Sequence, residues 1–202
     1  MLIIGLCGSS GAGKGYVCEK MSQHGVAHID TDKVYKKLVI AGSDCLKELC
    51  MFFGDEILKP DGSLDKRKLS SKVFEGENAS QHLKVLNTIT HRYIRQKVVS
   101  MLERLEAKGT WAAVIDAPVL FESGFNEMCD ATMLVSAPPH LKLERIMKRD
   151  RLSQKKAIAR LQSQLPDERL RELCDYEIIN DGVSDVDSQL NAVIEKLKSK
   201  GE

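Results

Sequence analysis

Short apolar runs alternate with longer amphipathic stretches along the chain. Apolar runs of four to six residues that end at turn-forming residues are typical of buried strands. Five such runs occur, at Leu2–Cys7, Val26–Ile29, Trp111–Ile115, Ala131–Val135 and Tyr176–Ile179. Between about 79 and 108, apolar residues repeat at helical spacing and predict one long helix. Its apolar face is expected to contain Leu83, Leu86, Ile94, Val98, Met101 and Leu105.

Strands that alternate with helices predict an α/β fold with a parallel sheet and helices on both faces. Ligands of such sheets bind beyond the carboxyl ends of the strands. Polar segments follow the first, second, third and fifth runs, so we expect them along one edge of the sheet. These segments are GSSGAGK, DTD, DAPVLFE and NDG.

Composition narrows the possible functions. The chain has 202 residues, enough for one domain, and its 30 basic and 29 acidic residues give a formal charge of +1. That balance predicts no nucleic-acid partner, and no apolar run is long enough to cross a membrane. The six cysteines form no C-x-x-C pair and no signal peptide is recognised, so we expect reduced thiols in a cytoplasmic protein.

The first polar segment has the spacing of a phosphate-binding loop, Gly8-x-x-x-x-Gly13-Lys14. Glycines allow consecutive backbone N–H groups to face phosphate oxygens, and the helix that follows presents its positive end. Lys14 is expected to reach the β- and γ-phosphates. A chance glycine turn is the alternative, but a strand before the loop and a helix after it favour nucleotide binding.

Gly15 departs from the usual loop, in which Ser or Thr follows the lysine and binds Mg²⁺. Glycine offers no such ligand, so the metal would be held through waters and other carboxylates. Adenylate-kinase-type loops also have the order G-K-G, so the departure does not by itself abolish activity. Tyr16 is not expected to replace the hydroxyl, and no residue is assigned as a metal ligand.

Carboxylates follow the second and third strands. Asp30 and Asp32 could take a proton from an acceptor hydroxyl or lie near Mg²⁺. Capping of the next helix is the alternative. Asp116 and Glu122 lie after the third strand, where Asp116 could lie near the metal or both could belong to a solvated loop.

The segment 142–160 is mostly basic. Arg145 and Arg149 are one turn apart on one predicted helix, and Arg160 and Gln164 are one turn apart on the next. Such a cationic flap could close over a triphosphate, although basic runs are more often solvated helix faces.

Asn87 and His91 interrupt the apolar face of the long helix. They could form a hydrogen-bonded core pair or face a substrate. The other histidines show no metal-ligand spacing; they are His24, His28, His82 and His140.

Taken together, these segments resemble the dephospho-CoA kinase family. The resemblance extends over nearly the whole chain, and the order of its pieces is more specific than the phosphate loop alone. The matching pieces are GLCGSSGAGK at 5–14, HIDTDKVYK at 28–36, FGDEIL and DGSLDKRKL within 53–69, LNTITH at 86–91, DAPVLFESG at 116–124, LERIMKRDRLSQKKAIARLQSQ at 143–164 and DYEIINDG at 175–182.

The resemblance implies an α/β P-loop kinase of three layers with a five-stranded parallel sheet. It implies one domain, with a core of about 1–36, 109–148 and 173–202, a helical CoA-binding region of about 37–108 and a lid of about 149–172. The implied reaction moves the γ-phosphate of ATP, with Mg²⁺, to the ribose 3′-hydroxyl of dephospho-CoA. A cytoplasmic monomer or weak homo-oligomer is expected.

The resemblance also implies roles for single residues. Those expected to bind ATP are Gly8, Gly11, Ala12, Gly13, Lys14, Gly15, Tyr16, Arg149, Arg160 and Asn180. Those expected to act in catalysis are Lys14, Asp30, Asp32, Arg145 and Arg149. Those expected to contact the acceptor are Asp32, Leu86, Asn87, His91 and Glu122.

The chain departs from the family pattern at four positions: Cys7 replaces Thr, Gly15 replaces Ser or Thr, Arg92 replaces Pro, and Lys66 replaces Arg. Two other functions therefore stay open. One is a P-loop kinase for a nucleoside or nucleotide acceptor, and the other is a nucleotide-binding regulator without catalysis.

Overall fold

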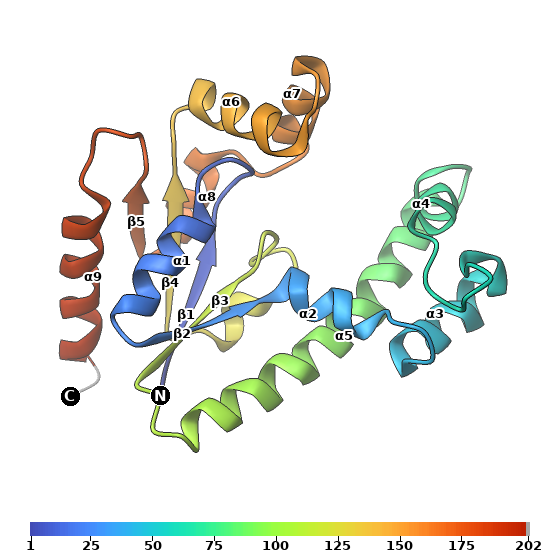
Figure 1. The fold of residues 1–202 in the computed structure, drawn as a ribbon, viewed down its shortest axis with the longest axis horizontal. Coiled ribbons are helices and arrows are strands. Elements are labelled where there is room, and N and C mark those ends of the chain that lie inside the picture. The colour runs from blue at the N-terminus through green and yellow to red at the C-terminus, as the bar shows by residue number, and fades with distance from the viewer. Residues whose placement is uncertain (201–202) are drawn as a thin grey trace. The chain divides into compact units, whose positions relative to one another are not determined.

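A computed structural model describes residues 1–200 and contains a five-stranded sheet of order β2-β3-β1-β4-β5 (Figure 1). The strand β1 pairs in parallel with β3 and β4, and β4 pairs in parallel with β5. The strands are β1 (Leu2–Cys7), β2 (Val26–Asp30), β3 (Ala112–Asp116), β4 (Ala131–Ser136) and β5 (Tyr176–Ile179). All five predicted strands are present, and their bounds differ from the prediction by at most one residue.

The chain divides into two compact units. The sheet unit comprises Met1–Ile29 and Leu105–Glu202, and the helical unit comprises Asp30–Arg104. The helices of the sheet unit are α1 (Lys14–Gln23), the 3₁₀ helix η2 (Phe125–Met128), α6 (Pro139–Asp150), α7 (Gln154–Gln162), α8 (Asp167–Leu173) and α9 (Val186–Lys200). The helical unit contains α2 (Thr31–Leu38), α3 (Asp44–Phe53), the 3₁₀ helix η1 (Asp55–Ile57), α4 (Lys66–Phe74) and most of α5 (Ala79–Glu106).

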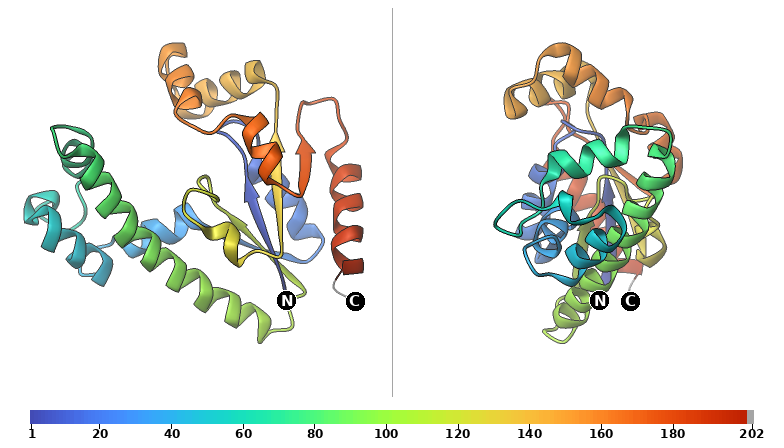
Figure 2. Two further views of the ribbon diagram at one scale, coloured as in Figure 1. Left: turned by 180° about the vertical axis from the view of Figure 1, so that it is seen from behind. Right: turned by 90° about the vertical axis from the view of Figure 1, so that its right-hand side faces the viewer.

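The core of the sheet unit lies between the sheet and two helices. Ile4 and Leu6 of β1 and Met133 of β4 are fully buried, and they cluster with Val17 of α1 and Leu190 of α9. Alternate residues of a strand point to one face, so α1 and α9 cover the same face of the sheet, and α9 runs beside β5 (Figure 2). This packing fixes the start of α1 at the carboxyl end of β1.

The helical unit has a core of its own. Leu49 of α3, Val73 of α4 and Ile89 of α5 are buried in one apolar cluster. Of the predicted apolar face of α5, Ile94 and Val98 are buried, and Leu83 and Leu86 pack half-buried against this cluster, whereas Met101 and Leu105 are only half-buried. The buried residues of α5 are Ile89, Thr90, Ile94, Val98 and Leu102. Among residues 1–200, no helix is both long and apolar enough to cross a membrane.

Candidate active site

The loop between β1 and α1 requires glycine at three positions. Gly8, Gly11 and Gly13 have φ values of 143°, 80° and 101°, a region that favours glycine. A Cβ atom would lie 2.3 Å from the Val135 carbonyl oxygen at Gly8 and 2.0 Å from the Asn180 side chain at Gly13. Steric fit therefore explains the glycine spacing that the sequence presents.

Gly15 lies in the first turn of α1 and is not required for space. A Cβ atom built there meets nothing within 4 Å among the described residues, and its backbone is helical. The absence of a side chain at this position is therefore not a consequence of crowding within the loop.

Lys14 begins α1, and its ammonium group lies across the loop. Its Nζ donates a hydrogen bond to the Gly8 carbonyl oxygen at 2.9 Å. The loop itself is closed by the Ala12 N–H, which donates to the Ser9 carbonyl oxygen at 3.1 Å. A cation held at this position faces the place where a helix N-terminus attracts phosphate.

Arg145 of α6 and Asn180 after β5 both contact the loop. Arg145 Nη1 donates to the Gly11 carbonyl oxygen at 3.2 Å, and Nη2 donates to the Asn180 carbonyl oxygen at 3.1 Å. Asn180 Nδ2 donates to the Ala12 carbonyl oxygen at 2.8 Å. The structure therefore brings together three predicted site elements that are far apart in the sequence.

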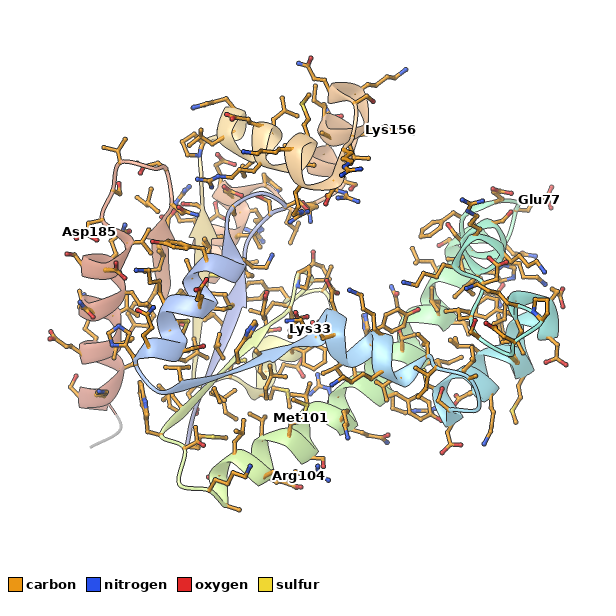
Figure 3. All side chains as sticks on the ribbon, viewed as in Figure 1. Lys33, Glu77, Met101, Arg104, Lys156 and Asp185 are labelled. Atoms are coloured by element: carbon orange, nitrogen blue, oxygen red, sulfur yellow. The ribbon has the colours of Figure 1, made fainter. Side chains whose placement is uncertain are left out.

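Arg149 and Arg160 meet at a single carboxylate. Arg149 Nε donates to Asp150 Oδ1 at 2.8 Å, and Arg160 pairs with the other carboxylate oxygen. The hydrogen bonds from Arg149 lower the pKa of Asp150 to about 2. Exposed basic side chains surround α6 and α7, among them Lys156 (Figure 3). The two arginines are therefore gathered on α6 and α7, where their ion pairs are open to solvent.

A buried polar network beneath the loop was not predicted. Lys142 of α6 and Asp167 of α8 are only 7% and 9% exposed. The Lys142 ammonium donates to Asp167 Oδ2 at 2.8 Å and to Ser9 Oγ at 3.0 Å, and Ser9 Oγ donates to Asp167 Oδ1 at 2.9 Å. From the sequence, Lys142 was treated only as one residue of the basic segment 142–160. The available signal was its position one helical turn before Arg145, on the side of the helix that faces the loop.

The prediction that Gln164 lies one turn after Arg160 on the second basic helix is wrong. The helix α7 ends at Gln162, so Gln164 does not share a helix face with Arg160. Instead, Gln164 Oε1 accepts a hydrogen bond from the Ser10 N–H at 2.8 Å. The segment between α7 and α8 is thereby attached to the phosphate loop.

The carboxylates after β2 lie at the start of the helical unit. Asp30 caps α2, because its Oδ1 accepts the Lys33 N–H at 2.9 Å. Asp32 lies in the first turn of α2 and is exposed. The capping alternative therefore describes the Asp30 side chain, and a role for either carboxylate in chemistry stays a prediction.

The other predicted acceptor residues lie on α5 and after β3. Asn87 is exposed on α5, which does not favour the core hydrogen bond considered for it, whereas Leu86 is half-buried. Burial lowers the pKa of His91. Glu122 is exposed in the turn between β3 and η2.

Arg92, where the family usually has Pro, has a structural explanation. Its guanidinium pairs with Glu48 of α3, and the Tyr93 hydroxyl donates to the same carboxylate at 3.0 Å. These contacts attach α5 to α3.

Cys7, where the family usually has Thr, lies beside Cys174. The two Sγ atoms are 3.3 Å apart. This hydrogen bond and burial raise the pKa of the Cys7 thiol, whereas the hydrogen bond lowers the pKa of Cys174. Burial raises the pKa of Cys45 to about 11 and that of Cys129 to about 12.

These pKa directions predict the order of thiol alkylation. A lower pKa gives a larger thiolate fraction near neutral pH, so iodoacetamide at about pH 8 is expected to modify Cys174 before Cys45 or Cys129. Peptide mass spectrometry during a time course measures the order. Modification of Cys129 ahead of Cys174 would contradict it.

A parallel sheet whose first strand leads through a glycine loop and Lys14 into α1 is the arrangement of a P-loop nucleotide-binding fold. The family model for dephospho-CoA kinase matches residues 2–185. The chain belongs to the dephospho-CoA kinase family and is a phosphotransferase. The predicted family, fold class and enzyme class are confirmed.

Individual relatives agree over nearly their full length. The dephospho-CoA kinase of Bacillus anthracis is 35% identical over 196 residues, which cover 96% of each chain. A crystal structure of TT1252 from Thermus thermophilus is 29% identical, with a TM-score of 0.82 and 97% of both chains covered. Dephospho-CoA kinase from Campylobacter jejuni is 27% identical, with a TM-score of 0.69, covering 99% of this chain and 98% of that one.

Proposed function

We propose that this chain transfers the γ-phosphate of ATP to the ribose 3′-hydroxyl of dephospho-CoA, giving coenzyme A and ADP. The observation that carries this proposal is that Lys14, Arg145 and Asn180 all contact the phosphate loop of this chain, which belongs to the family. The enzyme acts in the cytoplasm as a monomer or weak homo-oligomer.

Positioning and charge neutralisation supply the catalysis, because phosphoryl transfer needs little covalent chemistry from the protein. The loop residues Gly8 and 11–16 cradle the β- and γ-phosphates. Lys14 and Arg145 neutralise charge on the group being transferred. Arg149 and Arg160 exchange Asp150 for phosphate oxygens, since guanidinium groups bind either anion through the same pair of N–H donors. Asn180 lies near the adenine.

Acceptor binding involves the residues that the family resemblance implies. Asp32 orients the 3′-hydroxyl and accepts its proton, while Asp30 lies beside it as a helix cap. Leu86, Asn87 and His91 of α5 contact the acceptor, as does Glu122. In this proposal the CoA-binding region extends over about 37–108, and the lid extends over about 149–172.

Mg²⁺ is proposed to accompany ATP although Gly15 supplies no ligand. Mg²⁺ commonly keeps several waters and takes one or two carboxylates, so it does not require a hydroxyl at this position. The ion is proposed to be held through waters and carboxylates, with no single residue assigned as its ligand. When bound with ATP, the ion neutralises negative charge on the phosphates.

The deciding experiment measures ADP release from the purified chain with ATP and Mg²⁺, with and without dephospho-CoA. Acceptor-dependent ADP release with coenzyme A as the product supports the proposal. Release with a nucleoside or nucleotide but not with dephospho-CoA would favour another small-molecule kinase. Calorimetric ATP binding without turnover of any acceptor would favour a regulator.

Replacing each of the two carboxylates by an amide distinguishes proton transfer from helix capping. Asp32→Asn is expected to lower kcat about 10²-fold or more with ATP affinity retained, because the amide cannot accept the proton. Asp30→Asn keeps a good capping residue and is expected to change kcat less. A near-normal kcat for Asp32→Asn with a large loss for Asp30→Asn would reverse the assignment.

Gly15→Ser tests the missing hydroxyl. The side chain has space, so the variant is expected to fold and to be more stable by less than about 1 kcal/mol, because glycine destabilises a helix. It is also expected to reach half-maximal rate at a lower Mg²⁺ concentration. Gly15→Ala is the matched control, since it adds a Cβ atom without a ligand. An unchanged Mg²⁺ dependence in Gly15→Ser would show that the hydroxyl does not reach the metal.

A further inference from the structure

Three potential metal ligands converge inside the sheet unit. Cys18 lies on α1, His28 lies in β2, and Asp116 ends β3. One ligand atom from each side chain lies within 4.8 Å of the other two. His28 Nε2 and Asp116 Oδ2 are 3.7 Å apart.

The environment of these side chains is largely closed to solvent. Cys18 is 1% exposed, and the side chains of His28 and Asp116 are 24% and 14% exposed. The buried His28 Nε2 has no hydrogen-bond partner within residues 1–200. A buried polar atom without a partner costs free energy, and metal coordination is one way to remove that cost.

We propose that Cys18, His28 and Asp116 bind one divalent cation of the zinc type. Zn²⁺ takes sulfur at about 2.3 Å and nitrogen or oxygen at about 2.0–2.2 Å, so tetrahedral ligand atoms lie about 3.3–3.8 Å apart. The 3.7 Å between His28 Nε2 and Asp116 Oδ2 is close to that separation. The thiolate and imidazole select Zn²⁺ or Co²⁺ over Mg²⁺, which prefers oxygen ligands.

The site would connect the phosphate-loop helix to the sheet. Cys18 lies one helical turn after Lys14, so a bound cation joins α1 to β2 and β3 directly behind the loop. Cys18 binds as the thiolate and releases its thiol proton to the buffer. Three protein ligands leave a fourth position for water. The site is separate from the proposed phosphate chemistry and needs no ATP.

Titration of the chelator-treated full chain with Co²⁺ tests the site directly. One equivalent is expected to produce a near-ultraviolet thiolate-to-cobalt absorption band. Zn²⁺ should abolish the band, whereas excess Mg²⁺ should not. Binding should also raise Tm, since the cation binds the folded state.

Variants assign the band to these residues. Cys18→Ala and His28→Gln are each expected to weaken Co²⁺ binding at least about 100-fold. Cys129→Ala is the control, because this half-buried thiol of the same unit is outside the cluster and its variant should keep the band. Circular dichroism checks folding, and His28→Gln carries the test if Cys18→Ala does not fold. Absence of stoichiometric Co²⁺ binding, or a band that persists in folded His28→Gln, overturns the proposal.

Discussion

Lys14→Ala is expected to reduce kcat about 10²–10³-fold or more, because removal of one preorganised charge donor at a phosphoryl-transfer site costs at least that much. The loop should keep its shape, since its three constrained glycines and the contacts from Arg145 and Asn180 do not depend on the lysine. Single-turnover ADP formation with dephospho-CoA measures the loss of rate. Calorimetry measures whether ATP still binds.

Lys20→Ala is the matched control for Lys14→Ala. Lys20 lies on the same helix, but its ammonium pairs with Asp187 of α9 at 2.8 Å. Its removal is expected to leave kcat nearly unchanged. A Lys14→Ala variant with near-normal kcat would show that another cation, with Arg145 the first candidate, neutralises the transferring phosphate.

The sequence predicted the fold well because strand signals are local. Apolar runs mark the five strands, and the order of glycines marks the loop. The ends of the strands were predicted less accurately than the strands themselves. Trp111 continues an apolar run but lies just before β3, where its indole N–H donates to the His24 carbonyl oxygen. The face of α5 was predicted less well, because burial of residues such as Ile89 depends on packing against α3 and α4.

The site was predicted less completely because its polar contacts connect distant parts of the chain. Glycine spacing identified the loop, but no local pattern indicates that Ser9 contacts Lys142 and Asp167. Likewise, Cys18, His28 and Asp116 have no recognisable ligand spacing and converge only when α1, β2 and β3 are assembled. Charge runs were equally ambiguous, since the same basic stretch contains a buried lysine and exposed arginines.

The buried pair of Lys142 and Asp167 supports the second large expected effect, on stability. Asp167→Ala leaves the Lys142 ammonium buried without its carboxylate, and it deprives Ser9 of a hydrogen-bond acceptor. Removal of one partner of a buried ion pair costs about 3–5 kcal/mol of unfolding free energy. Urea denaturation followed by Trp111 fluorescence measures this loss within the sheet unit, since Trp111 is the single tryptophan and belongs to that unit.

Two controls separate the buried charge from general damage. Asp187→Ala removes a partner of a more exposed ion pair and is expected to change the unfolding free energy much less. The double variant Lys142→Met with Asp167→Leu removes both charges and should recover the part of the loss that comes from the unpaired ammonium, although the buried Ser9 hydroxyl still lacks both partners. A loss below about 1 kcal/mol for Asp167→Ala would mean that water reaches Lys142. The ammonium would then be free to turn from the loop toward solvent, and α6 and α8 would be joined to Ser9 less firmly than the 2.8–3.0 Å contacts indicate.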